Sequence, residues 1–476
     1  MVEPLQNPPL LRDIECEASI PPLFPYQIEG GEWLASKAQA LLADEMGLGK
    51  TAQAIRACDL TRSTKVLILC PAAARVNWLR EFETFSILPR TFRIVKTRTP
   101  DLNHLDSIIC SYDLAQDLNE HLKDHHFDAL ILDEGHFLKN HTSKRTKAVF
   151  GVAGLIRKAA RCWVLSGTPA PNHAGELWPM LYTFGATPLK YEGFIKHFCN
   201  SYASPRGRGV RCITGSKVQA IPELKVLLKK IMLRRKKEDV MTQLPPITYA
   251  DVVVEAGFVD IDVESSLIQW LWPVDRRKEL LEQLNKERQL LEDVTGQAGF
   301  GPGGMRLLEA MAQSVSTLRR YSGLQKVEPV VELIASELEN NAYEKVVIFA
   351  LHRDVIEGLR VRLKAYKPVT LYGKTPPEQR QKNIDKFMRE PKYRVFIGNI
   401  HAAGTAITLT AAHNVVFIEQ DWVPGNNAQA AMRCHRIGQT KPVLVRFIGL
   451  AGNIDEKVSR ILKQKARDLT EIFDSQ

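Results

Sequence analysis

The chain has 476 residues, of which 45% are hydrophobic and 25% are charged. This composition is typical of a globular protein and excludes a disordered or fibrous chain, and the length predicts about two to four domains. The formal net charge of +10 favours a polyanionic partner, although a merely solvated basic surface explains the charge equally well when it is considered alone.

The eight cysteines are scattered, and no two have a C-x-x-C spacing. We therefore expect neither a zinc site nor a disulfide framework, and we expect a reducing environment. The sequence contains no leader pattern at its start and no apolar run near the ~20 residues that cross a bilayer. We expect a soluble intracellular protein without a membrane partner, in the cytoplasm or nucleoid of a bacterium or virus-infected cell, or in the nucleus of a eukaryote.

The first informative element is a glycine-rich octet, residues 44–51, between an apolar lead-in and a predicted helix, residues 51–60. Backbone N–H groups at such a helix start converge on an anion, and the helix dipole favours negative charge there. We expect this loop to hold the phosphates of a nucleoside triphosphate, with a hydroxyl for Mg²⁺. An ordinary glycine-rich turn is the alternative. The residues expected to bind are Asp44, Gly47, Leu48, Gly49, Lys50 and Thr51.

Short apolar runs then recur between helical patterns, at residues 65–70, 107–112, 129–132 and 162–165. Nearly continuous apolar strands that alternate with helices predict a parallel sheet covered on both faces. We assign residues 1–245 to one α/β domain.

The third of these strands ends in two carboxylates, Asp133 and Glu134. Ligands of open α/β sheets bind at the carboxyl ends of parallel strands. We expect Asp133 to hold Mg²⁺ near Thr51, and Glu134 to orient and deprotonate an attacking water. An acidic strand end that caps the next helix is the alternative. His136 either links this site to Ser166–Pro169, a common kind of turn at the end of the next strand, or is a packed imidazole.

Two regions depart from the alternation of strands and helices. Residues 176–240 and 260–324 are predicted to be mainly helical, and the second region contains a glycine-rich connection at residues 296–304. The basic segment 206–211 is either a phosphate contact or a disordered loop.

A second alternating set defines a domain at residues 246–476, which we expect to end in a helix. Its predicted strands are residues 345–350, 369–372, 394–397, 414–418 and 443–448. Near the end of this set, Arg433 and Arg436 are three residues apart and would share one face of a helix. Guanidinium groups bind phosphate oxygens bidentately and stay charged, so we expect a transition-state clamp here. A solvated basic helix face is the alternative.

Taken together, these blocks resemble helicase superfamily 2 and, within it, the SWI/SNF (Snf-two) double-stranded DNA translocases, especially the compact branch that includes annealing helicases. The matching stretches cover nearly the whole chain in order. They are residues 25–27, 44–51, 70–71, 77–78, 133–140, 166–169, 233–235, 244–246, 404–412, 422–424 and 429–439.

The resemblance implies two RecA-like parallel-sheet lobes with inserted helical protrusions, ATP and Mg²⁺ as ligands, and double-stranded DNA as a partner without sequence preference. It implies that Gln27 contacts adenine and that Gln429, Arg433 and Arg436 supply the second lobe's side of the ATP site, with Gly404 near the nucleotide and DNA. Two departures are Thr405-Ala406 after Gly404, where the family has Gly-x-Gly, and Met432, where it often has an acid.

The sequence thus predicts a monomeric, DNA-dependent ATPase that translocates on duplex DNA, with possible protein partners on the DNA. A strand-separating DNA or RNA helicase with the same ATPase core is one alternative. A nucleic-acid-binding scaffold without catalysis is another, but the presence of both halves of a clamp argues against it.

Overall fold

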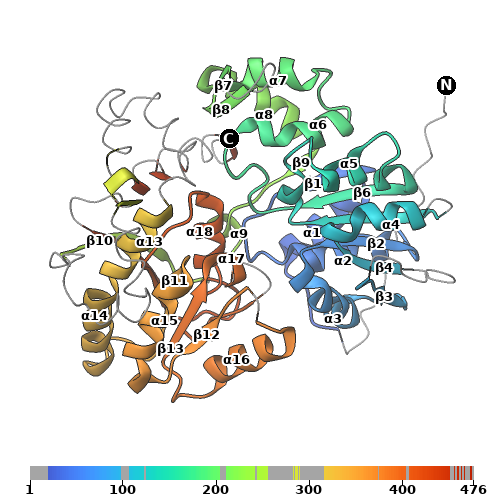
Figure 1. Ribbon diagram of the computed structural model, residues 1–476. Coiled ribbons are helices and arrows are strands. Elements are labelled where there is room, and N and C mark those ends of the chain that lie inside the picture. Colours follow the sequence, from blue (N-terminus) through green and yellow to red (C-terminus); the bar gives the residue numbers. More distant parts are fainter. Residues whose placement is uncertain are drawn as a thin grey trace, which may run out of the picture. The chain divides into compact units, whose positions relative to one another are not determined.

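The computed structural model describes residues 20–97, 107–122, 125–203, 211–241, 244–255, 316–373, 375–403 and 407–450, with isolated positions between 282 and 289 and between 455 and 473. The chain divides into two compact units. Unit 1 contains Met1–Thr242 and Asp468–Gln476, and unit 2 contains Gln243–Arg467. Figure 1 draws unit 1 mainly in blue to green and unit 2 mainly in yellow to red.

Within the described residues of unit 1, seven parallel strands form one sheet in the order β3-β4-β2-β5-β6-β1-β9. The strands are β1 (Gln39–Leu42), β2 (Val66–Cys70), β3 (Phe92–Ile94), β4 (Ser107–Ser111), β5 (Phe127–Asp133), β6 (Ala159–Leu165) and β9 (Met232–Leu233).

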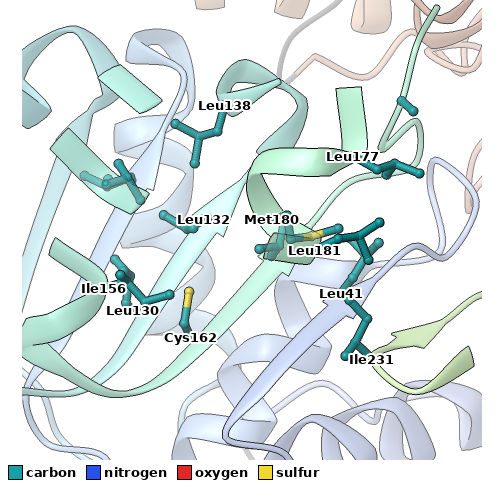
Figure 2. Packing of buried hydrophobic residues seen from close by; sticks show 14 of the residues in the cluster. Leu41, Leu130, Leu132, Leu138, Ile156, Cys162, Leu177, Met180, Leu181 and Ile231 are labelled. Carbon is teal, nitrogen blue, oxygen red and sulfur yellow. The ribbon is translucent and has the colours of Figure 1, made fainter. Parts of the chain in front are cut away.

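Successive side chains of these strands pack on opposite faces of the sheet, as the pleat requires. Leu41 belongs to one hydrophobic cluster, whereas Ala40 and Leu42 belong to the other. Figure 2 shows part of the first cluster, in which Leu41 lies near Met180, Leu181 and Ile231, and Leu130, Leu132 and Cys162 of β5 and β6 lie farther along the sheet. Burial on both faces explains why the strands are almost continuously apolar.

Helices cover unit 1, and a hairpin of β7 (Cys199–Ala203) and β8 (Arg211–Ser216) is added to it. The helices are α1 (Pro25–Ala35), α2 (Lys50–Leu60), α3 (Arg75–Phe85), α4 (Ala115–His121), α5 (Lys144–Phe150), α6 (Trp178–Thr183), α7 (Tyr191–Phe198), α8 (Ile221–Lys229) and α9 (Lys237–Val240).

The described part of unit 2 contains a second parallel sheet, in the order β10-β15-β14-β11-β13-β12. Its strands are β10 (Ile247–Val254), β11 (Val346–Ala350), β12 (Val369–Leu371), β13 (Val395–Asn399), β14 (Asn414–Phe417) and β15 (Val443–Leu450). The helices are α13 (Ser316–Gln325), α14 (Val327–Glu339), α15 (Arg353–Arg362), α16 (Pro377–Arg389), α17 (Ile400–Ala403) and α18 (Pro424–Ala431). Two hydrophobic clusters again cover the two faces.

The predicted α/β class with two parallel sheets is confirmed. The apolar runs do not predict β1, β3, β9 or β10, and residues 176–240, predicted to be helical, also contain the β7–β8 hairpin. Most of the second predicted protrusion (260–324), the glycine-rich connection 296–304 and the basic residues 206–210 lie outside the described residues. Nothing among the described helices has the length and hydropathy of a bilayer-crossing segment.

Candidate active site

Three neighbouring strands of unit 1 bring the predicted site residues to one edge of the sheet. β6 pairs in parallel with β1 on one side and with β5 on the other. Parallel strands present their carboxyl ends at the same edge. The glycine-rich loop after β1, the carboxylates at the end of β5 and Ser166 after β6 therefore lie along one edge.

The loop after β1 depends on two glycines with left-handed backbone. Gly47 has φ 92° and Gly49, which precedes the first residue of α2, has φ 70° and ψ 41°. A Cβ atom at Gly49 would lie only 2.2 Å from Nε2 of Gln27. The loop thus needs glycine for both conformation and space, and it ends at a helix N-terminus, where anions are favoured.

Lys50 connects this loop to the carboxylates of β5. Its ammonium group donates hydrogen bonds to the main-chain carbonyls of Asp44 (2.7 Å) and Glu45 (3.2 Å). Burial lowers the pKa of Lys50, and the charges of Glu134, Asp44 and Asp133 oppose that shift. The lysine therefore lies within the electrostatic reach of both acidic residues at the end of β5.

Asp133 is held at both its side chain and its backbone. The indole N–H of Trp78 donates to its Oδ2 (2.8 Å), and the hydroxyl of Tyr112 donates to its main-chain carbonyl (2.8 Å). Burial raises the pKa of Asp133 to about 7, and the neighbouring charge of Glu134 adds to the rise. A partly buried carboxylate with a raised pKa gains stability from a nearby cation, so Asp133 is a residue that could hold a Mg²⁺ ion.

Glu134 begins a short link from β5 to the end of β6. Its φ of 52° is unusual for a residue other than glycine. Its Oε2 lies 3.4 Å from Nδ1 of His136, and the same nitrogen lies 3.4 Å from Oγ of Ser166. Ser166 Oγ also accepts a hydrogen bond from the backbone N–H of Thr168 (3.3 Å). His136 is thus placed to link the two strand ends.

The remaining loop residues contact one another or other parts of unit 1. Gln27 is buried and donates from Nε2 to the carbonyl of Leu48 (3.3 Å), which brings its amide beside the loop. The carboxylate of Asp44 is fully buried and bound to Arg235 and Gln53. Its contacts are those of an anchor for the loop. Thr51 is half-buried in the first turn of α2.

In unit 2, the helix expected to carry both arginines ends at Ala431, and Arg433 and Arg436 lie in the turns beyond it. The Nε2 of Gln439 lies within hydrogen-bond distance of the carbonyls of Thr410 (3.2 Å), Ala412 (2.9 Å) and Cys434 (3.0 Å), which holds these turns against the preceding loop.

Arg436 donates to the carbonyl of Ile407 (3.0 Å) and to the hydroxyl of Thr408 (3.1 Å). Gln429 lies on α18 and is buried. The structure therefore brings Gln429, Arg433 and Arg436 into one region of unit 2, and Gly404 lies outside the described residues.

In the described part of unit 1, several side chains without a predicted role contact the site residues. They include Gln53, Trp78, Tyr112 and Arg235. A role for Gln53 could be predicted from the sequence. It is a polar residue three positions after Lys50, in the first turns of a helix whose other residues are mostly small or apolar. The other three touch the site across long sequence separations, which no local pattern indicates.

Residues 26–256 match the SNF2-related domain family, and residues 325–438 match the helicase conserved C-terminal domain family. The chain is 28% identical to a SWI/SNF-related matrix-associated actin-dependent regulator of chromatin subfamily A-like protein 1 of Drosophila melanogaster, over 98% of this chain and 58% of that protein. It is 30% identical to the Caenorhabditis elegans homolog, over 97% and 64%, and 28% identical to the DNA annealing helicase and endonuclease ZRANB3 of Bos taurus, over 94% and 40%.

The chain thus spans between 40% and 64% of the lengths of these three relatives. Among solved structures, the Sulfolobus solfataricus SWI2/SNF2 ATPase core in complex with dsDNA matches with 24% identity and a TM-score of 0.43, over 97% of this chain and 99% of that one.

Proposed function

Because the chain belongs to the SNF2-related family of helicase-type ATPases, we propose that it hydrolyses ATP and uses the energy to translocate along double-stranded DNA. The observation that carries the proposal is the convergence of the glycine-rich loop, Lys50 and the Asp133–Glu134 pair at one edge of the first sheet.

In this proposal the loop of unit 1 binds the phosphates. Backbone N–H groups around Gly47 and Gly49 and the ammonium of Lys50 contact phosphate oxygens. Lys50 then leaves the carbonyls that it contacts in the structure, and Gln27 contacts the adenine edge.

The carboxylates carry the hydrolytic step. Asp133 and the hydroxyl of Thr51 would hold Mg²⁺, and the ion would supply positive charge beside the phosphates. Glu134 orients the attacking water and accepts its proton, and His136 connects Glu134 to Ser166.

The second unit contributes positive charge. We propose that Gln429, Arg433 and Arg436 contact the nucleotide, with Arg436 stabilising the charge that develops on the transferred phosphoryl group. Gly404 brings the backbone of unit 2 near the nucleotide and DNA. These roles come from the sequence pattern and the family.

The partner in this proposal is duplex DNA, and the protein acts as a monomer. ATP favours one arrangement of the two units and its hydrolysis favours another, so that the units advance alternately along the duplex. A chain with a net charge of +10 is suited to a phosphate backbone. Backbone contacts read no sequence, so binding is expected to be nonspecific and to weaken steeply with salt.

The competing function is strand separation by the same ATPase core, and the match of residues 325–438 to the helicase conserved C-terminal domain family makes it a specific alternative. A triplex-displacement assay beside a strand-displacement assay on forked duplex distinguishes the two. A translocase removes the third strand in an ATP-dependent manner and leaves the duplex paired. Unwinding of the fork without triplex displacement would contradict duplex translocation. Lys50→Ala serves as the inactive control in both assays.

A further inference from the structure

The segment that follows α8 runs alongside the phosphate loop of unit 1. β9 pairs in parallel with β1, with Leu41 opposite Met232 and Leu42 opposite Leu233. The backbone contacts continue past the strand into the loop, because the N–H of Glu45 donates to the carbonyl of Arg235 (2.9 Å). The two segments lie about 190 residues apart in sequence, as their hydrogen bonds show.

The side chain of Arg235 forms a bidentate contact with Asp44 at the start of the loop. Its Nε donates to Oδ1 of Asp44 (3.1 Å), and one terminal nitrogen donates to Oδ2 (2.6 Å). The backbone N–H of Arg235 also donates to Oδ1 (3.1 Å). Asp44 is completely buried. A planar guanidinium group that binds both oxygens of a buried carboxylate fixes its orientation as well as its charge.

Gln53 extends this contact to the far end of the loop. Its Oε1 accepts from Arg235 (2.7 Å), while its Nε2 donates to Oδ2 of Asp44 (3.0 Å) and to the carbonyl of Leu48 (3.2 Å). Only this orientation of the amide is consistent, because a guanidinium group cannot accept a hydrogen bond. One buried amide therefore joins Arg235 to both ends of the loop.

The surrounding packing leaves this network little room to move. The guanidinium of Arg235 also donates to the carbonyl of Tyr26 in α1 and lies 5.5 Å from the centre of the Tyr26 ring. A Cβ atom at Gly30 would lie 1.8 Å from Oε1 of Gln53 and 2.6 Å from Arg235. Helix α1 therefore packs directly against the network.

The network also reaches the lysine that we assign to the phosphates. Arg235 binds the side chain of Asp44, and the main-chain carbonyl of the same Asp44 accepts a hydrogen bond from Lys50. Movement of Asp44 would consequently change the conformation of the loop and the place from which Lys50 acts.

We propose that Arg235 is a positioning residue for ATP: together with Gln53 it holds Asp44 and the loop in the conformation that binds the phosphates. This inference rests on the proposed ATPase function. Asp44 then anchors the loop internally. The bidentate guanidinium group of Arg235 should be required for ATP binding, because a lysine could keep the charge but not both hydrogen bonds.

The test compares Arg235→Lys, Asp44→Asn and the double variant with wild type, with Lys229→Ala on the exposed side of α8 as the matched control. KM for ATP and kcat are measured separately at saturating duplex DNA, because KM does not depend on the fraction of protein that is folded. We expect Arg235→Lys to raise the KM roughly ten- to a hundredfold, with a smaller change in kcat. Lys229→Ala should match wild type.

The double variant should be no worse than the more damaging single variant, because both changes break the same contact. An Arg235→Lys protein that unfolds at a lower temperature but keeps the wild-type KM would overturn the inference, since Arg235 would then serve stability alone. Fully additive effects of the two substitutions would also overturn it. If wild type itself does not hydrolyse ATP, the proposed function fails instead, and direct binding of a fluorescent ATP analogue to the same variants still tests Arg235.

Discussion

The turn after β1 in unit 1 and the turn after β11 in unit 2 both join a buried strand to a helix, but they differ in the negative charge that they face. In unit 2, the backbone N–H groups of Leu351 and His352 both donate to Oε2 of Glu419 (2.9 Å each), just before α15. Oε1 of the same carboxylate lies 2.5 Å from Nδ1 of His352. The chain therefore supplies its own anion at this helix start.

In unit 1, both acidic residues of the loop point elsewhere, and Oε2 of Glu45 accepts a hydrogen bond from the backbone N–H of Lys237 (2.8 Å). The carboxylate of Asp44 binds Arg235 and Gln53, and the ammonium group of Lys50 donates hydrogen bonds to main-chain carbonyls. This difference favours binding of an external phosphate at the turn of unit 1, where the carboxylates of the loop are bound elsewhere. It also explains why we assign phosphate binding to one unit and charge stabilisation to the other.

The largest expected effect tests what unit 2 contributes. Arg436→Ala should lower DNA-stimulated ATP turnover at least about 10³-fold, because a guanidinium group that stabilises transferred phosphoryl charge is worth that much. Nucleotide affinity, measured with a fluorescent ATP analogue, should change little. The exposed Arg389 on α16 provides the control, as Arg389→Ala. Wild-type turnover in Arg436→Ala would show that Arg436 does not stabilise the transferred phosphoryl group.

The next effect tests the carboxylates of unit 1. Glu134→Gln should bind ATP normally and hydrolyse it roughly 10³-fold more slowly, because the amide cannot accept a proton from water. Single-turnover kinetics with labelled ATP measure the step directly. Glu83→Gln, an exposed change on α3, should behave as wild type. Hydrolysis by Glu134→Gln at the wild-type rate would assign the base to another residue.

A smaller effect tests how Asp133 is held. Trp78→Phe removes the indole N–H that binds Oδ2 and should raise the Mg²⁺ concentration that supports nucleotide binding by about ten- to a hundredfold, as for other outer-shell partners of metal ligands. Trp163→Phe is the matched control, because the buried Trp163 donates its N–H to the carbonyl of Lys37 and not to the site. An identical Mg²⁺ requirement in both variants would contradict the role of Trp78.

The smallest effect on ATP binding is expected from a change in the turn after β11 of unit 2, where Glu419 accepts hydrogen bonds from the backbone. Glu419→Gln should lower the free energy of unfolding by about 1–3 kcal/mol, because buried N–H groups lose a charged acceptor, and should leave the KM for ATP unchanged. Chemical denaturation and ATP titration measure the two quantities. A raised KM would show that this turn also acts on the nucleotide.

The same contact has a defined pH dependence. Burial alone raises the pKa of Glu419, but the hydrogen bond and charge of His352 hold it below the ordinary value of 4.5. A carboxylate with a lowered folded pKa stabilises the protein above its ordinary pKa and loses that contribution as the pH falls. The stability difference between wild type and Glu419→Gln should therefore shrink below about pH 4.5.

Much of the fold follows from the sequence because buried parallel strands leave continuous apolar runs. Those of β2, β4, β5, β6 and β11 to β15 are visible in this way, whereas β9 is two residues long and β10 alternates half-buried with exposed residues. The site residues in the loop and at the end of β5 follow from local patterns. Arg235 and Trp78 could not be assigned roles, because their contacts to Asp44 and Asp133 depend on which strands become neighbours.

The most direct test of duplex-driven hydrolysis is the rate of ATP turnover by the wild-type chain with and without duplex DNA, over a range of salt concentrations, with Lys50→Ala as the inactive reference. We predict turnover that duplex DNA stimulates strongly, that salt suppresses by weakening DNA binding, and that Lys50→Ala abolishes. Wild-type turnover that is absent, or that is the same with and without duplex DNA, would contradict the account.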